Sequence, residues 1–238
     1  MSGIFSNYRC LHELLFPDTV KAVTARESGA MSEPEFRDFI RWRDGLTRLD
    51  MDSSSFNCYY ADVLARDFED ARLVFVIRDC FSWLDSFLNM VLFLGPMTVD
   101  WMVGYVRRFV GPAYERELSD RPDDLQAALP GMVDAGFRYW STTNTFVLRH
   151  LPADRSLILR TRELSRSAPA LASFLAIPEE SLTLDQSHLN QAEGKYHCLQ
   201  MVDRQVVYYA FERHCSDLMR EFFPTVTLAG FLRDDRRA

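Results

Sequence analysis

The chain has 238 residues, of which 47% are apolar and 13% aromatic, and this composition excludes a disordered chain and suffices for the core of one α/β domain. The formal net charge of -7 argues against nucleic-acid binding, and no apolar stretch reaches the roughly 18 residues of a membrane helix. No charged leader opens the chain, and the five cysteines lack the spacing of a zinc site, so we expect a cytoplasmic protein without bound metal.

Before residue 70 the period of the apolar residues predicts three helices and one short strand. They are a helix over 8–15 that Pro17 closes, a strand over 20–24, a helix over 34–46 and an amphipathic helix over about 56–68. Aspartate and serine side chains at 52–55 are suited to cap the last of these helices.

The apolar run Leu73–Ile77 is typical of a parallel strand covered on both faces. A helix over 82–94 follows it and ends at Gly95 and Pro96. The region from about 97 to 140 contains no clear strand and is rich in large apolar residues, so we expect helices there.

The rest of the chain is predicted to hold a helix over about 135–150, a strand over 157–160, a helix over Ala168–Leu175 and a long helix over about 200–223. Because strands alternate with helices, we expect a helix-rich α/β protein with a short parallel sheet in a three-layer arrangement. One domain over residues 1–238 is the expected organisation.

Arg78 stands at the carboxyl end of the Leu73–Ile77 strand, where ligands bind in open α/β sheets. The next helix offers amide donors and the positive end of its dipole to an anion. Ser86 lies about two turns into that helix and offers a hydroxyl if its face looks inward. A surface ion pair with Asp79 or Asp85 is the alternative explanation of Arg78.

Three segments together resemble the sulfotransferases that use 3'-phosphoadenosine 5'-phosphosulfate (PAPS). The first is the strand with Arg78, Asp79 and Ser86. The second is SLILRTRELSRSAPALASFLAIPEESL at 156–182, which is similar to a strand, an E-x-L turn and a helix with a FLGI signature, although Ala176 replaces the glycine. The third is NQAEGKYHCL at 190–199, similar to a loop that closes over the nucleotide.

The resemblance implies the P-loop sulfotransferase fold, PAPS as donor, adenosine 3',5'-bisphosphate (PAP) as product, and a small-molecule or glycan hydroxyl as acceptor. It also implies that the helices over about 97–140 cover the active site, and the many aromatic residues there are explained either by an apolar acceptor pocket or by packing. Arg78 and Ser86 would then hold the 3'-phosphate. The remaining nucleotide-binding residues would be Ser6, Asn7, Tyr8 and Arg9 on the 5' side, with Gly194 and Lys195 in the closing loop. Lys195 is equally explained as a solvated loop residue.

The amino terminus departs from the family, whose first strand leads into a loop of the type K-x-G-T-T. Residues 4–8 align with that loop and contain no lysine, and the chain has only two lysines in all, Lys21 and Lys195. A late start, a degenerate member and an altered loop all explain this departure. The alternative function is therefore a catalytically impaired sulfotransferase-like binding or assembly protein.

Sulfuryl transfer also needs a group that takes the acceptor's proton. Glu27 matches the family's glutamate best, and His12, expected in the first helix, is a rival whose ordinary pKa suits the task. A solvated loop charge and a helix-surface residue are the respective alternatives. Cys80 is interpreted as a packing residue, although Arg78 and the helix amino terminus would favour its thiolate. A homodimer face at 206–209 and 222–223 is a further expectation, with packing against the sheet as its alternative.

Overall fold

The computed structural model describes residues 7–13, 15–93, 100–115, 121–182 and 196–234. It is helix-rich with pairs of parallel strands, which agrees with the predicted α/β class. The chain divides into two compact units, the first made of residues 1–77 and 144–190 and the second of residues 78–143 and 191–238. The expectation of one domain stays a prediction.

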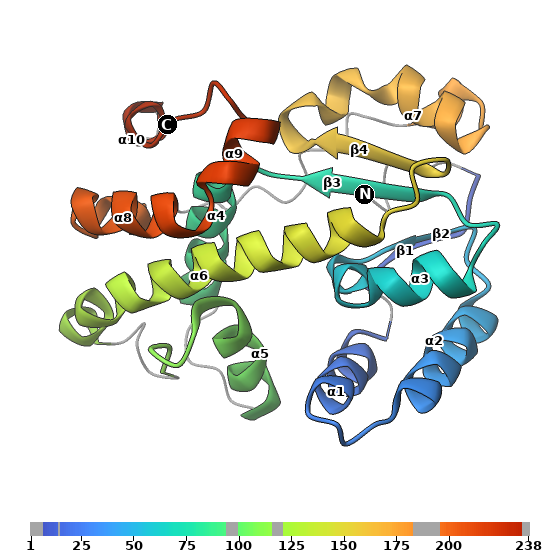
Figure 1. Cartoon of the computed structure of the whole chain (residues 1–238), viewed down its shortest axis with the longest axis horizontal. Helices are drawn as coiled ribbons and strands as arrows, with labels where there is room; N and C mark the ends of the chain where they lie inside the picture. The colour runs from blue at the N-terminus through green and yellow to red at the C-terminus, as the bar shows by residue number, and fades with distance from the viewer. Residues whose placement is uncertain (1–6, 14, 94–99, 116–120, 183–195, 235–238) are drawn as a thin grey trace. The chain divides into compact units, whose positions relative to one another are not determined.

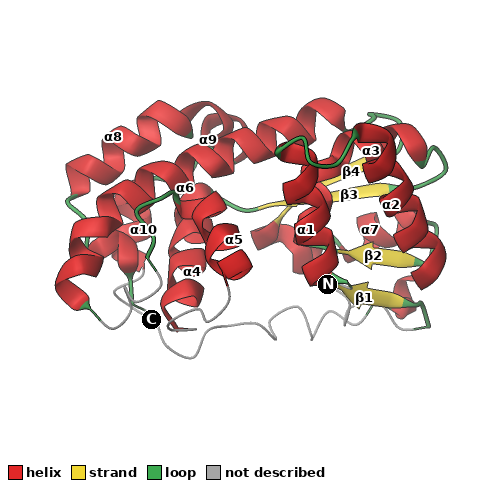
Figure 2. Ribbon diagram, turned by 90° about the horizontal axis from the view of Figure 1, so that it is seen from below, coloured by secondary structure: helices red, strands yellow, loops and turns green. Residues whose placement is uncertain are grey.

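The first unit contains two pairs of parallel strands (Figure 2). β1 (Cys10–His12) pairs with β2 (Met51–Ser53), and β3 (Leu73–Ile77) pairs with β4 (Ser156–Arg160) from Leu73 opposite Ser156 to Ile77 opposite Arg160. The prediction for β3 is confirmed residue for residue. The expectation that both of its faces are covered is wrong, because only Ile77 of this strand is buried and Ile158 on its partner is 41% exposed.

The helices of the first unit are α1 (Phe16–Glu27), α2 (Glu33–Thr47), α3 (Ala61–Asp67) and α7 (Ala168–Leu175). α2 begins with a capping box, in which the Ser32 hydroxyl accepts the amide of Glu35 and the Glu35 carboxylate accepts the amide of Ser32. The core of this unit is largely aromatic and aliphatic, and its buried members include Val23, Phe36, Ile40, Phe56 and Tyr60.

Two predictions near the amino terminus are wrong. The described residues of 8–15 are not a helix, because they contain β1 and because Glu13 and Leu15 have positive φ of 54° and 57°. Residues 20–24 are not a strand but lie inside α1. Pro17 begins that helix rather than closing one, since proline fits the first turn, where its missing amide costs no bond.

The second unit is helical and contains α4 (Cys80–Phe93), α5 (Asp100–Val110), most of α6 (Pro122–His150), α8 (Arg204–His214), α9 (Ser216–Phe222) and α10 (Leu228–Asp234), as Figure 1 shows. α5 and α6 confirm the helical prediction for 97–140 where residues are described. The single helix predicted over 200–223 is wrong, because it is divided into α8 and α9 at Cys215. None of the described helices is long and apolar enough to cross a membrane.

Candidate functional site

The buried side chain of Asp79 caps the amino terminus of α4. Its Oδ1 accepts the amide of Ser82 at 3.0 Å and its Oδ2 accepts the hydroxyl of Ser82 at 2.6 Å, while its carbonyl accepts the amide of Trp83 at 2.9 Å. The amide of Cys80 donates to Sδ of Met219 at 3.4 Å. The expectation that this helix offers its first amides to an outside anion is therefore wrong for Cys80 and Ser82, because an internal carboxylate and a thioether already accept them.

Arg78 is fixed at both its backbone and its side chain. Its carbonyl accepts the indole N–H of Trp140 at 3.0 Å, and its Nε donates to the Ser82 hydroxyl at 3.0 Å. The guanidinium is thereby held beside the first turn of α4 and stays partly exposed. A side chain held in this way loses less conformational freedom when it binds a ligand.

The polar residues of α4 lie on one side of an otherwise apolar helix. At 100° per residue, Ser82, Asp85, Ser86 and Asn89 fall within an arc of about 100°. Ser86 is exposed and lies one turn beyond Ser82 on the same face. Arg78, Ser82 and Ser86 therefore follow one another along α4, and we call them the Arg78 row.

The same stripe binds the described end of the predicted closing loop, residues 196–199. The Asp85 carboxylate accepts the amide of Leu199 at 3.1 Å and the side-chain amide of Asn89 at 3.0 Å, and Asn89 Oδ1 accepts the amide of Tyr196. Two distant segments of the predicted site are thus brought together on α4. Three of the predicted nucleotide-binding residues lie outside the described residues, namely Ser6, Gly194 and Lys195.

Burial opposes a reactive thiol at the start of α4. Cys80 has no exposed surface, and burial, followed by a hydrogen bond with Cys215, raises the pKa of its thiol well above the usual value. Burial and the neighbouring Asp85 similarly raise the pKa of Cys198 to about 12. These observations favour the interpretation of Cys80 as a packing residue.

The residues predicted for the 5' side lie in the first unit and precede β1. Arg9 donates from Nε and Nη2 to the Asp50 carboxylate at 3.2 and 3.1 Å, and this hydrogen bonding raises the pKa of Arg9 and lowers that of Asp50. Asn7 is exposed with φ of 68°, and Tyr8 is half-buried. β1 ends at His12 and α1 begins at Phe16, so Asn7 and Tyr8 precede β1 and do not lie between it and α1, which contradicts their alignment with the loop. The other aligned residues, 4–6, lie outside the described residues.

His12 is the last residue of β1 rather than a helix residue, and its side chain is 48% exposed. Its Nδ1 lies 3.1 Å from the carbonyl of Ser53, and only the tautomer with a proton on Nδ1 donates there, which leaves Nε2 as an acceptor. Nε2 is 3.9 Å from Oε1 of Glu13. Glu27 is the exposed last residue of α1, about 16 Å along the helix from its start at Phe16. The structure therefore does not bring His12 and Glu27 together.

Sequence reasoning missed Ser82, Asn89 and Trp140 as site residues. Ser82 is detectable as the third residue after the Asp79 cap, and the pair of Asp85 and Asn89 is detectable as polar residues four apart in an apolar helix. Trp140 gives no such indication, because a single tryptophan in a helical stretch is more often a core residue.

No protein-family model matches this chain, and no curated protein is significantly similar to it. Among the residues that the structure describes, no group of three or more histidine, cysteine, aspartate or glutamate side chains is arranged to hold a metal ion.

Proposed function

We propose that this protein binds a 3'-phosphorylated adenine nucleotide at the Arg78 row and uses PAPS as a sulfuryl donor. The observation that carries the proposal is the 3.0 Å bond between Arg78 Nε and the Ser82 hydroxyl, with Ser86 one turn further along the same face. A guanidinium with adjacent hydroxyls provides the charge-assisted hydrogen bonds that a phosphate dianion needs. The resemblance to sulfotransferases assigns that phosphate to the 3' position.

The proposed reaction is in-line transfer of the sulfuryl group to an acceptor hydroxyl. The acceptor oxygen forms a bond to sulfur as the bond from sulfur to the bridging oxygen breaks, PAP leaves, and the acceptor proton passes to a base. Nε2 of His12 is preferred as that base, because a proton on Nδ1 that is donated to the Ser53 carbonyl leaves the lone pair on Nε2. Glu27 remains the alternative.

A catalytically impaired nucleotide-binding protein is the second candidate, and the loop between β1 and α1 favours it. Glu13 occupies this loop, where the related enzymes carry a lysine. A carboxylate repels a phosphosulfate instead of balancing the charge on its bridging oxygen, which is commonly a large catalytic contribution. Binding without transfer is the outcome expected of this candidate.

Calorimetric titration of PAP, with adenosine 5'-phosphate as the ligand that lacks the 3'-phosphate, tests the nucleotide site. We expect Arg78→Gln to weaken PAP binding by about 10- to 100-fold and to leave the weak binding of adenosine 5'-phosphate unchanged. Arg72→Gln is the matched control, since Arg72 is an exposed arginine next to the other end of β3. Equal affinities for the two nucleotides, or an unchanged affinity of the Arg78→Gln variant for PAP, would disprove the proposed site.

Transfer is tested separately with radiolabelled PAPS and a panel of phenol, sterol and glycan acceptors. A labelled product that is lost in His12→Gln and retained in Glu27→Gln supports the enzyme and its proposed base. PAP binding without any labelled product favours the impaired protein, and loss of product in Glu27→Gln alone would reverse the assignment of the base.

A further inference from the structure

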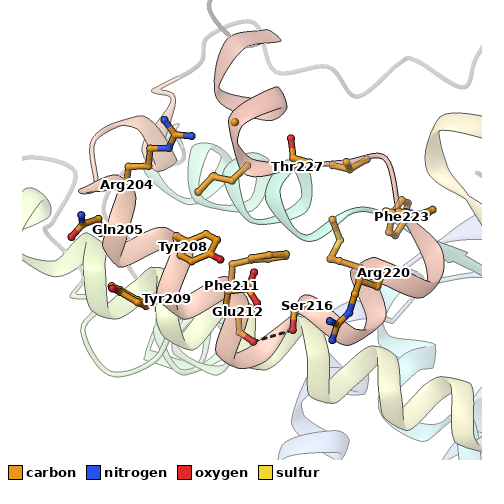
Figure 3. Close-up of a pocket in the computed structure, with 15 residues that line it drawn as sticks. Arg204, Gln205, Tyr208, Tyr209, Phe211, Glu212, Ser216, Arg220, Phe223 and Thr227 are labelled. Carbon is orange, nitrogen blue, oxygen red and sulfur yellow. Dashed lines mark hydrogen bonds between the residues drawn. The ribbon is translucent and has the colours of Figure 1, made fainter.

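The second unit contains a cavity of about 710 Å³ between α8, α9 and α10 (Figure 3). Its floor is apolar and includes Phe211 together with Met219, Phe223 and Leu228, which are 2%, 5% and 7% exposed. This volume lies within the usual range of small-molecule sites, about 300 to 1,000 Å³.

The rim of the cavity is polar and its charges are unevenly distributed. Arg204 stands at the start of α8, and no ion pair joins it to any of the described residues. Arg220 is paired with Asp217, so its charge is already compensated. Glu212 lies eight residues after Arg204, about 12 Å further along α8. An anionic group is therefore favoured at the Arg204 end and disfavoured near Glu212.

Aromatic side chains line the space between the floor and the Arg204 end. Figure 3 shows the rings of Tyr208 and Phe211 on the cavity side of α8. Tyr208 is 48% exposed, which leaves a large ring face available to a flat ligand. We propose that this cavity binds a small, planar apolar molecule that carries one anionic group, with its rings against Tyr208 and Phe211 and its anion at Arg204.

The cavity is separated from the Arg78 row by a packed layer of side chains. Met219 in its floor accepts the amide of Cys80, and the ring of Phe211 lies 4.9 Å from that of Phe81. Cys80 and Phe81 have no exposed surface, so they close the cavity toward the start of α4. The cavity is therefore a second site, and its occupation does not require the nucleotide.

Fluorescence titration with 8-anilinonaphthalene-1-sulfonate, an apolar anion with a flat naphthalene ring system, tests the proposal on the full chain. We expect one saturable site per chain and a loss of affinity of about tenfold in Arg204→Gln. The neutral analogue N-phenyl-1-naphthylamine should bind equally well to the unmodified protein and to Arg204→Gln, because it has no anionic group that interacts with Arg204. Arg213→Gln is the matched control, since Arg213 is an exposed arginine of the same helix outside the cavity.

A second variant, Ala229→Phe, places a ring in the cavity and should abolish the binding of both probes. Arg78→Gln should leave them unchanged, which separates this site from the proposed nucleotide site. Unaltered sulfonate binding in Arg204→Gln or Ala229→Phe, or no saturable binding at all, would overturn the proposal. Probe binding that decreases as protein concentration rises would mean that a second copy covers the cavity through the exposed Val206 and Tyr209, and would also overturn it.

Discussion

Asn89 is a buried polar residue whose side chain joins α4 to the segment beginning at Tyr196. Its amide donates to Asp85 and its carbonyl accepts the amide of Tyr196. We predict that Asn89→Leu lowers the free energy of unfolding by about 1 to 3 kcal/mol, because the N–H of Tyr196 and the buried carboxylate of Asp85 each lose a partner. Urea unfolding followed by circular dichroism measures this change.

Ser86→Ala is the matched control for that prediction, since Ser86 belongs to the same polar stripe but is exposed. Its free energy of unfolding should stay within about 0.5 kcal/mol of the unmodified protein. Equal stabilities of the Asn89→Leu variant and this control would show that the bonds of Asn89 add nothing.

Asp67 forms ion pairs with three arginines in the first unit, and its side chain is only 1% exposed. Hydrogen bonds from Arg37, and then from Arg66, lower the pKa of Asp67, and Arg41 lies 3.2 Å away. A carboxyl group with a lowered folded-state pKa stabilises the fold above its unfolded pKa, about 3.9, and this contribution is lost as pH falls through the folded pKa.

We therefore predict a pH-dependent difference in unfolding free energy between the unmodified protein and Asp67→Asn. The difference should be constant from neutral pH to about pH 5 and should shrink below about pH 4. Urea unfolding across this range measures it, with Asp38→Asn as control, because Asp38 is 78% exposed in its pair with Arg41. A difference that does not change with pH would contradict the role of the Asp67 charge.

At the residue scale, the sequence identified Arg78 because one charge directly follows an apolar run. It did not identify the partners of the site, which come from remote parts of the chain. Trp140 is 62 residues from Arg78, and Tyr196 is 107 residues from Asn89. Contacts at such separations are determined by the packing of elements and leave no local pattern.

At the element scale, α6 approaches α4 closely at Gly136. A Cβ atom at this position would lie 2.4 Å from Cδ1 of Leu84, which is wholly buried. We predict that Gly136→Ala destabilises the protein by about 1 to 3 kcal/mol, because overpacking outweighs the gain in helix propensity. Thermal and urea unfolding measure the effect.

The same substitution at Gly104 in α5 is expected to have the opposite effect on stability. A Cβ atom there meets nothing within 4 Å, so helix propensity alone should stabilise the protein by about 0.5 to 1 kcal/mol. If Gly136→Ala stabilised the protein as much as Gly104→Ala, that result would contradict the close approach of α6 to α4 at Gly136.

The sequence pattern did not predict where α6 begins. The sequence predicted unbounded helices over about 97–140 and a separate helix from about residue 135, and Pro130 and Gly131 both oppose a single helix through this point. The structure begins the helix at Pro122 and continues it through Pro130, where Leu129, Met132 and Val133 are buried. Burial of these side chains outweighs the lost hydrogen bond. The helix Ala168–Leu175, which has no such conflict, was predicted with correct bounds.

At the scale of the whole molecule, the predicted site residues divide between the two units. Arg78 and Ser86 belong to the second unit, whereas His12 and Glu27 belong to the first. The chain crosses between the units after residues 77, 143 and 190, and the first of these boundaries has no adjacent glycine or proline. Composition therefore gave no indication of this first boundary, which arises from long-range contacts.

Hydrogen exchange measured by mass spectrometry tests the proposed nucleotide site across the whole chain. A bound ligand stabilises the state that binds it, so saturating PAP should slow exchange in peptides that cover α4 and residues 196–200. Arg78→Gln should show less slowing at the same PAP concentration, because its affinity is lower. Protection of the α8–α10 peptides in place of α4 would instead mean that PAP, which joins a planar base to anionic phosphates, occupies the Arg204 cavity and that the Arg78 row is not its site.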